Sequence, residues 1–332
     1  MGTTQTTPTL STKLLLTGGA LALVAAVALG LCNGASSYSL AQLVFDDDAR
    51  TIVLSLRLPR ILFGVCVGGT LAVVGAAYQA MFRNSLASPF SLGVSSGAAL
   101  GASLSLFLGW GAHLSVDVSA VLAAGISIVL ILALNRVGAR ASQDSLLLIG
   151  VVFSFFCSSV LTLIQYMSDY TQLFRVSRWM LGGVPVVSWN VVAIAAAVSA
   201  ATTAWLILKH RHFDLILFGE DFASAKGVDP QSFLRAAFVV TSIAVGWFVA
   251  QCGVIGFVGI IVPAAVRLAV GLHHRRVLPL SFIAGALLIV VCDTLGRVVT
   301  PPFEVPAGVF TAVLGGPVFV LLLLTSHRRA LS

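Results

Sequence analysis

Charged side chains are scarce in this sequence. Only 9% of its 332 residues are Asp, Glu, Lys or Arg, whereas a soluble globular domain carries roughly 25%. Hydrophobic residues make up 58% of the chain, and the mean hydropathy is +1.03. Too few polar side chains remain to cover a globule in water, which excludes a soluble enzyme, a disordered chain and a coiled coil. A transmembrane barrel would need alternating apolar and polar residues, so the continuous apolar runs predict an all-α polytopic membrane protein.

Ten apolar runs are candidates to cross a bilayer as transmembrane helices. They cover residues 14–32, 61–82, 92–109, 118–135, 146–166, 190–208, 235–252, 255–271, 279–296 and 306–326. The run over 255–271 begins in a Gly-rich turn and contains Pro263, so we expect this helix to be short or broken. No shift in composition divides the chain, and we therefore expect a single membrane domain over 1–332.

Glycines recur at a spacing of four residues inside two of these runs. Gly64 and Gly68 form one such pair, and Gly93, Gly97 and Gly101 form a double one. Small residues at this spacing let helices approach each other closely. We interpret them as helix-packing positions rather than as binding positions.

Lysine is the rarer of the two basic residues, and the net charge of +7 rests mostly on arginine. If both termini lie inside, 13 of the 19 basic residues, including every lysine, fall in inner segments and six fall outside. The positive-inside rule therefore predicts cytoplasmic termini, with a short cytoplasmic tail over 1–13 and a cytoplasmic loop over 209–235. No stretch combines basic residues with stacking aromatics, so we expect no nucleic-acid partner.

Motifs of metal and catalytic sites are missing from the sequence. The five cysteines form no CxxC pair, and the six histidines lie in loops or at the ends of apolar runs. Within the spans there is no HExxH motif, paired carboxylate or Ser/His arrangement. We therefore expect no catalytic residue, no metal ligand and no cofactor on this chain, which disfavours a membrane-embedded enzyme.

The long inner loop has the pattern of a folded element. The sequence predicts a short amphipathic segment with Asp214 as its N-cap, a break at Gly219, a helix through Glu220–Lys226 and a stop at Gly227. A simple connector between two spans needs only a few residues. Two interpretations stay open on these residues, a cytoplasmic partner surface and an amphipathic helix that rests on the membrane.

Several motifs follow one another in the order typical of one permease family. The segment LILFGEDFASAKGVDP in the inner loop matches the ATPase-coupling pattern LxLGExxAxxLGV. The other matching segments lie at 57–102, 179–183 (WMLGG), 253–271, 293–297 (DTLGR) and 304–319 (EVPAGVFTAVLGGPVF). Together they cover almost the whole chain, which resembles the FecCD-type permeases of ABC importers for iron-siderophores, cobalamin and haem.

This resemblance implies ten spans with both termini inside, in agreement with the charge count. It also implies a second copy of the chain or a paralogous permease, two cytoplasmic ABC ATPase subunits, a periplasmic or lipid-anchored binding protein, and surrounding membrane lipids. ATP would bind the ATPase, and no lysine of this chain lies in a GxxxxGK[ST] motif. The resemblance puts five residues in the groove of the ATPase: Gly219, Glu220, Asp221, Ala223 and Gly227.

Six outer arginines run against the positive-inside bias, and three of them match positions of the family. In similar permeases, arginines at the positions of Arg57, Arg60 and Arg297 receive glutamates of the binding protein. A planar guanidinium suits a carboxylate partner, while ordinary snorkelling at the membrane interface is the alternative. We hypothesise that these three arginines form the docking set. Asp293 lies at membrane depth, and we expect it to pair with Arg297 four residues further on.

Two inner stretches, Asn84–Leu92 and Ser142–Leu146, are candidates for the gate, because similar permeases close their path there. The sequence departs from the family pattern at Ser85, Phe90 and Ala264, where Pro, Gly and His are usual. We expect a broad, mildly polar path that lets a bulky cargo leave again. The candidate gate and path residues are Gln79, Asn84, Ser85, Ser95, Ser96 and Gln165.

The sequence thus favours the permease subunit of an ABC importer in the bacterial inner membrane, without enzymatic activity of its own. A bulky metal chelate, above all an iron-siderophore, is the expected cargo, with haem, cobalamin and molybdate as alternatives. An ion-gradient-driven secondary transporter is the alternative class. It would show acidic or broken-helix ion sites within the membrane, and here only Asp293 has that character.

Overall fold

The computed structural model describes residues 12–34, 46–90, 92–109, 115–137, 143–299, 301 and 303–330. Every regular element in these ranges is a helix. The helices are α1 (Thr12–Cys32), α3 (Asp47–Ile52), the π-helical turn η1 (Val53–Arg57), α4 (Leu58–Met81), α5 (Val94–Phe107), α6 (Val116–Val137), α7 (Gln143–Met167), α8 (Tyr170–Met180), α9 (Trp189–Leu208), α10 (His210–Leu217), α11 (Glu220–Ala225), α12 (Pro230–Cys252), α13 (Val258–Val270), α14 (His274–Val298) and α15 (Ala307–Ala330).

Seven helical segments in the described residues are long and apolar enough to cross a membrane. They are α1, the continuous segment Asp47–Met81, α6, α7, α9, α12 and α14. The remaining three expected spans coincide with shorter apolar helices, α5, α13 and Ala307–Leu322 within α15. As expected, α13 is short, with 13 residues, and it contains Pro263. The residue directly before this helix, Phe257, has a left-handed backbone conformation with a φ of 68°.

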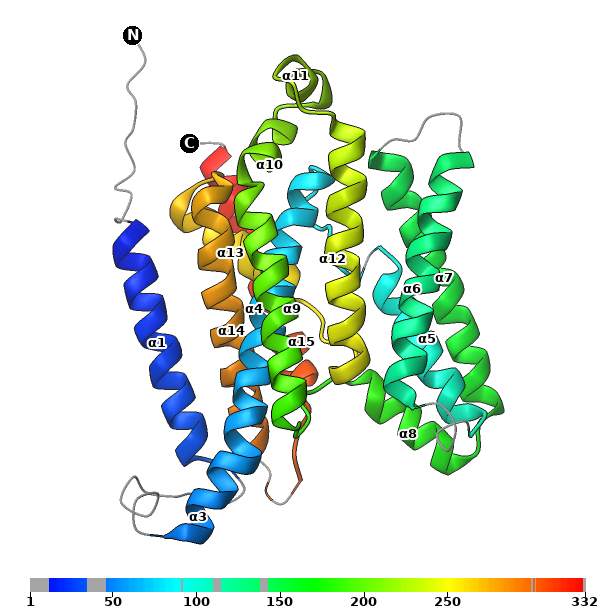
Figure 1. Cartoon of the computed structure of the whole chain (residues 1–332), viewed down its shortest axis with the longest axis vertical. Coiled ribbons are helices and arrows are strands. Elements are labelled where there is room, and N and C mark those ends of the chain that lie inside the picture. Colours follow the sequence, from blue (N-terminus) through cyan, green and yellow to red (C-terminus); the bar gives the residue numbers. More distant parts are fainter. Residues whose placement is uncertain are drawn as a thin grey trace.

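The long helices run side by side along the long axis of the molecule, and α4 passes through the middle (Figure 1). Nearly all of α4 from Ile61 to Met81 is buried. A helix that is apolar all round is stable only when other helices surround it. The short helices α10 and α11 lie at one end of the bundle, which we call the α10 end, and α3 and α8 lie at the opposite, α8 end (Figure 1). The start of α1 and the end of α15 lie toward the α10 end.

Three of the five patterned glycines, Gly68, Gly97 and Gly101, are helix-packing positions, as predicted. Gly64 has only ordinary contacts, and Gly93 is the cap residue before α5, with a φ of 84°. A Cβ on Gly68 would collide with the backbone carbonyl of Gly285, and one on Gly285 with that of Gly68, so α4 and α14 touch at their backbones. On α5, added Cβ atoms at Gly97 and Gly101 would collide with side chains and backbone of α6. Only glycine allows helix axes to come this close.

Two elements at the α8 end were not predicted. The helix that includes α4 starts at Asp47, well before the expected residue 61, through α3 and η1. The amphipathic helix α8 follows directly after α7, and Asp169 and Gln172 form a capping box at its start. The spacing Asp-x-x-Gln is a recognised helix-start signal, so the sequence did contain a marker for α8.

Helix α1 lies at the edge of the bundle and is fixed mainly by its second half. Only Ala26 and Gly30 on this helix are buried. Ala26 packs in a small cluster with Ile61 of α4 and Val290 of α14. In the first half of α1, Gly18 faces open space, whereas a Cβ on Gly19 would lie 3.1 Å from Ile283 of α14.

Candidate functional site

The loop between α9 and α12 folds into a compact unit, as predicted. Phe213 and Ile216 anchor α10 in the core. Gly219, between α10 and α11, has a φ of 118°, and Gly227, just after α11, has a φ of 81°. Both conformations favour glycine. Ala223 of α11 is buried.

The exposed face of this unit carries two aromatic rings that the sequence analysis did not single out. Phe218 is 75% exposed and Phe222 is 44% exposed, and their ring centroids lie 5.6 Å apart. Glu220 and Asp221 form the first turn of α11, where negative charge suits the helix dipole. An aromatic pair with flanking acids, raised on a short folded loop, is a surface suited to bind a partner.

Asp214 does not cap α10, so that prediction is wrong. Asp214 lies inside the helix, and the cap position is Lys209. The Oδ1 atom of Asp214 accepts hydrogen bonds from the backbone N–H of His274 at 2.9 Å and from its Nδ1 at 2.7 Å. Burial alone would raise the pKa of Asp214, but the hydrogen bonds from His274 outweigh it and hold that pKa below its ordinary value. This contact ties the loop to the start of α14.

The three arginines of the predicted docking set line one small pocket at the α8 end, and two of them, Arg60 and Arg297, bind the same buried carboxylate. Arg60 Nη2 lies 2.9 Å from Asp293 Oδ1, and Arg297 Nε lies 3.1 Å from Asp293 Oδ2. The expected pair of Asp293 and Arg297 is therefore confirmed, with Arg60 as an additional partner. Arg60 also binds Glu304, with 2.8 Å between Nη1 and Oε2.

Arg57 and Arg297 also hold the end of α1. Arg57 Nη1 donates to the carbonyl of Leu31 at 2.8 Å, and Arg297 donates to the carbonyl of Gly30 at 3.2 Å. The last carbonyls of a helix lack partners within it and carry partial negative charge. Arg57 is 8% exposed and Arg297 is 4% exposed. Of the three arginines, Arg60 alone reaches the cavity described next.

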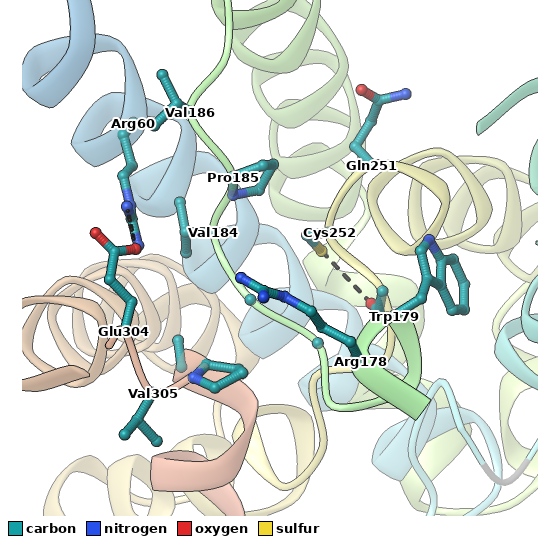
Figure 2. Close-up of a pocket in the computed structure, with 15 residues that line it drawn as sticks. Arg60, Arg178, Trp179, Val184, Pro185, Val186, Gln251, Cys252, Glu304 and Val305 are labelled. Carbon is teal, nitrogen blue, oxygen red and sulfur yellow. Dashed lines mark hydrogen bonds and ion pairs between the residues drawn. The ribbon is translucent and has the colours of Figure 1, made fainter. Parts of the chain in front are cut away.

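A cavity of about 360 Å³ opens beside Arg60 at the α8 end (Figure 2). The Arg60–Glu304 pair lies on one side of it, the extended segment 182–186 crosses it, and Trp179 and Gln251 lie on the other side. The side chain of Arg178 extends into this space between them (Figure 2). No ion pair of Arg178 occurs among the described residues. The cavity therefore offers one cation without a paired carboxylate to an incoming anionic group.

The candidate gate residues lie near the α10 end. Gln79 is buried, and its Nε2 donates to the carbonyls of Ser85 at 2.9 Å and Ile260 at 3.1 Å. The Oδ1 atom of Asn84 accepts from the backbone N–H of Leu86 at 2.9 Å and shapes the turn. Gln79 thus fastens the gate loop to α13. Ser142 of the second gate candidate lies outside the described residues.

The remaining predicted path residues have different surroundings. Ser95 is buried at the start of α5, with its Oγ 3.4 Å from the carbonyl of Pro89, and Ser96 beside it is half-buried. Gln165 is half-buried near the end of α7 and donates to the sulfur of Met180 at 3.3 Å. Gln165 therefore belongs to the α8 end, far along the bundle from the gate loop (Figure 1). Their role as path residues stays a prediction.

A model of the FecCD transport family matches residues 19–325 of this chain. The hemin transport system permease protein HmuU of Yersinia pestis is 35% identical over 95% of this chain and 97% of its own length. The vitamin B12 import system permease protein BtuC of Vibrio cholerae is 35% identical over 83% of each chain. An uncharacterised ABC transporter permease protein of Bacillus subtilis, YvrB, is 37% identical over 85% of this chain and 82% of its own length.

Two solved structures are similar in fold. One, described as an inward-facing conformation of a proposed metal-chelate type ABC transporter, has a TM-score of 0.84 and 29% identity, over 95% of this chain and 99% of that chain. The other, PsaBC from Streptococcus pneumoniae in complex with a Fab, has a TM-score of 0.52 and 17% identity, over 86% of this chain and 95% of that chain. At that identity, the second match concerns the fold alone.

Proposed function

Because this chain belongs to the FecCD transport family, we propose that it is the membrane permease subunit of a binding-protein-dependent ABC importer. The chain is a multi-pass membrane protein, and we assign it to the bacterial inner membrane as one permease domain. We take α5, α13 and α15 as spans in addition to the seven long ones, which gives ten. Short helices are tolerated in a membrane where neighbouring helices cover them. The termini and the α10 end are then cytoplasmic, as the positive-inside rule predicts.

The main support for this proposal is the folded α10–α11 unit. A secondary transporter has no need of a partner surface in the cytoplasm, whereas an ABC permease must receive a separate ATPase there. We propose that the exposed Phe218 and Phe222, with Glu220 and Asp221 beside them, enter a groove of the ATPase. ATP hydrolysis then belongs to the ATPase, and this chain contributes no catalytic group and no bound cofactor.

Replacing the aromatic pair tests the coupling. The double variant Phe218→Ser with Phe222→Ser should still fold, because both rings are exposed, and should lose the ATPase from the purified complex. Phe174→Ser on α8 is the matched control, since Phe174 is 58% exposed at the opposite end. Equal ATPase retention by the two variants would contradict the proposal.

We propose that a binding protein docks at the α8 end, through Arg57, Arg60 and Arg297 as the docking set. Support comes from the pocket that the three arginines line together and from the cavity beside Arg60. Arg60→Gln should abolish stimulation of ATPase activity by the binding protein, because the guanidinium that lines the cavity and would receive a carboxylate is lost. Arg175→Gln on α8 is a control with an exposed arginine at the same end. Unchanged stimulation in the Arg60 variant would count against docking at this site.

We propose a bulky metal chelate as the cargo, with an iron-siderophore first and haem, cobalamin or molybdate as alternatives. The unpaired Arg178 in the outer cavity favours a chelate that carries anionic groups. Two copies of this chain, or this chain with a paralogous permease, would enclose the path. Uptake of several radiolabelled chelates into proteoliposomes that contain the ATPase, with the binding protein added outside, identifies the cargo. Uptake without nucleotide would favour the secondary transporter instead.

A further inference from the structure

An apolar groove of about 250 Å³ lies between the first half of α1, the second half of α13 and the first half of α14. Its walls consist of glycine, alanine and aliphatic side chains, among them Gly19, Ala265, Ala284 and Leu287. Leu15 and Leu16 in the first half of α1 pack against the core, and the groove lies beside this contact, opposite the end of α1 that Arg57 and Arg297 hold.

Positive charge flanks this groove at its end toward α10. Arg276 lies one turn before Leu280, a groove residue on α14, and therefore on the same face of that helix. Lys13 lies two residues before Leu15 of the groove and therefore on a different face of α1. Both cations are exposed, and neither forms an ion pair among the described residues. Neither α1, α13 nor the part of α14 up to Leu287 contains Asp or Glu. The groove itself is therefore apolar, and Arg276 is the charged group of α14 one turn beyond it.

We propose that this groove binds one acyl chain of an anionic phospholipid, with the lipid phosphate held by Arg276. The proposal takes from the proposed function only the orientation, in which this end of the bundle meets the cytoplasmic leaflet. The groove, of about 250 Å³, is too small to take up a helix of about 10 Å width, whereas a single acyl chain is slender enough to enter it. Basic residues between helices at the cytoplasmic side are a recognised way to hold anionic headgroups.

Lipid retention tests the proposal without any transport partner. The full chain is reconstituted in nanodiscs with equal amounts of phosphatidylglycerol and phosphatidylcholine and then extracted into detergent. Native mass spectrometry counts the retained lipids. The unaltered protein should retain phosphatidylglycerol in preference to phosphatidylcholine. Arg276→Gln should reduce that preference about fivefold, since one basic residue near an anionic surface has an effect of this size. Arg136→Gln, an exposed arginine at the end of α6, should leave it unchanged.

Filling the groove tests the acyl-chain part of the proposal. Ala284→Phe should lower the retention of both lipids, whereas Ala196→Phe on the exposed side of α9 should not. If Ala284→Phe does not fold, Ala265→Leu fills the groove from an exposed position instead. Equal retention of the two lipids by the unaltered protein would overturn the proposal, as would full retention in a folded groove-filling variant. These outcomes are independent of ATPase binding and uptake.

Discussion

The carboxylate of Asp293 holds Arg60 and Arg297 together in the arginine cluster at the α8 end. One oxygen of Asp293 binds Arg60 at 2.9 Å and the other binds Arg297 at 3.1 Å. Asp293 and Arg297 are each 4% exposed, so water cannot replace the missing partner. Asp293→Asn keeps the shape of the side chain and removes its charge. Two guanidinium groups then face each other without a counter-charge between them.

The size of this effect follows from burial. Removing one partner of a buried ion pair costs about 3–5 kcal/mol, because the remaining charge is left uncompensated. Glu304 binds the same Arg60 at 2.8 Å, but its side chain is 42% exposed. An exposed ion pair contributes about 0–1 kcal/mol. Asp293→Asn should therefore destabilise the fold by at least about 2 kcal/mol more than Glu304→Gln does.

Unfolding of the two variants in mixed micelles with increasing denaturing detergent measures this difference. Asp293→Asn should shift the midpoint strongly, and Glu304→Gln should lie close to the unaltered protein. The end of α1 should loosen first in Asp293→Asn, because Arg297 also binds its last carbonyls. Equal midpoints for the two variants would refute the argument that the buried carboxylate organises the cluster.

Two further predictions concern the other contacts of α14. Gly68→Ala should destabilise the protein by about 1–3 kcal/mol, because the new methyl group collides with the backbone of Gly285; Gly125→Ala, which meets nothing within 4 Å, should have no such effect in the same detergent titration. Asp214 has a pKa below its ordinary value of 3.8, so its contact with His274 stabilises the α10 unit above that pH and is lost as the pH falls through the lower pKa of the folded protein. Spin-label mobility on α10 should rise at that low pH, and the Asp214→Asn protein should be mobile at all pH values; a pH-independent, immobile label in that variant would contradict the assignment.

Patterns within one segment of the sequence predicted the structure well. The apolar runs located the long helices to within about five residues, but they missed the amphipathic helix α8 and the extension of α4 by α3 and η1. Gly219 and Gly227 marked the ends of the short helices in the inner loop, because each adopts a backbone conformation that favours glycine. These features depend on local backbone preference and on apolar periodicity, which a single sequence contains.

Contacts between distant segments could not be predicted in the same way. Asp214 matched the rule for a helix cap, but its partner His274 lies 60 residues further along the chain. Arg57 and Arg297 matched the family pattern for docking, yet each also binds carbonyls of α1, which are 26 and 267 residues away. Local rules do not contain this information, since a long polar side chain binds whichever partner the fold brings within reach.

The double use of the arginines determines which variant can test docking. Neutralising Arg57 or Arg297 releases the last carbonyls of α1, so a loss of stimulation by the binding protein would not separate docking from a local change of fold. Arg60 has no contact with α1 among its hydrogen bonds. When Arg60 is replaced by Gln, Asp293 keeps its ion pair with Arg297. Arg60→Gln is therefore the substitution that removes the guanidinium lining the cavity while the carboxylate of Asp293 keeps one cationic partner.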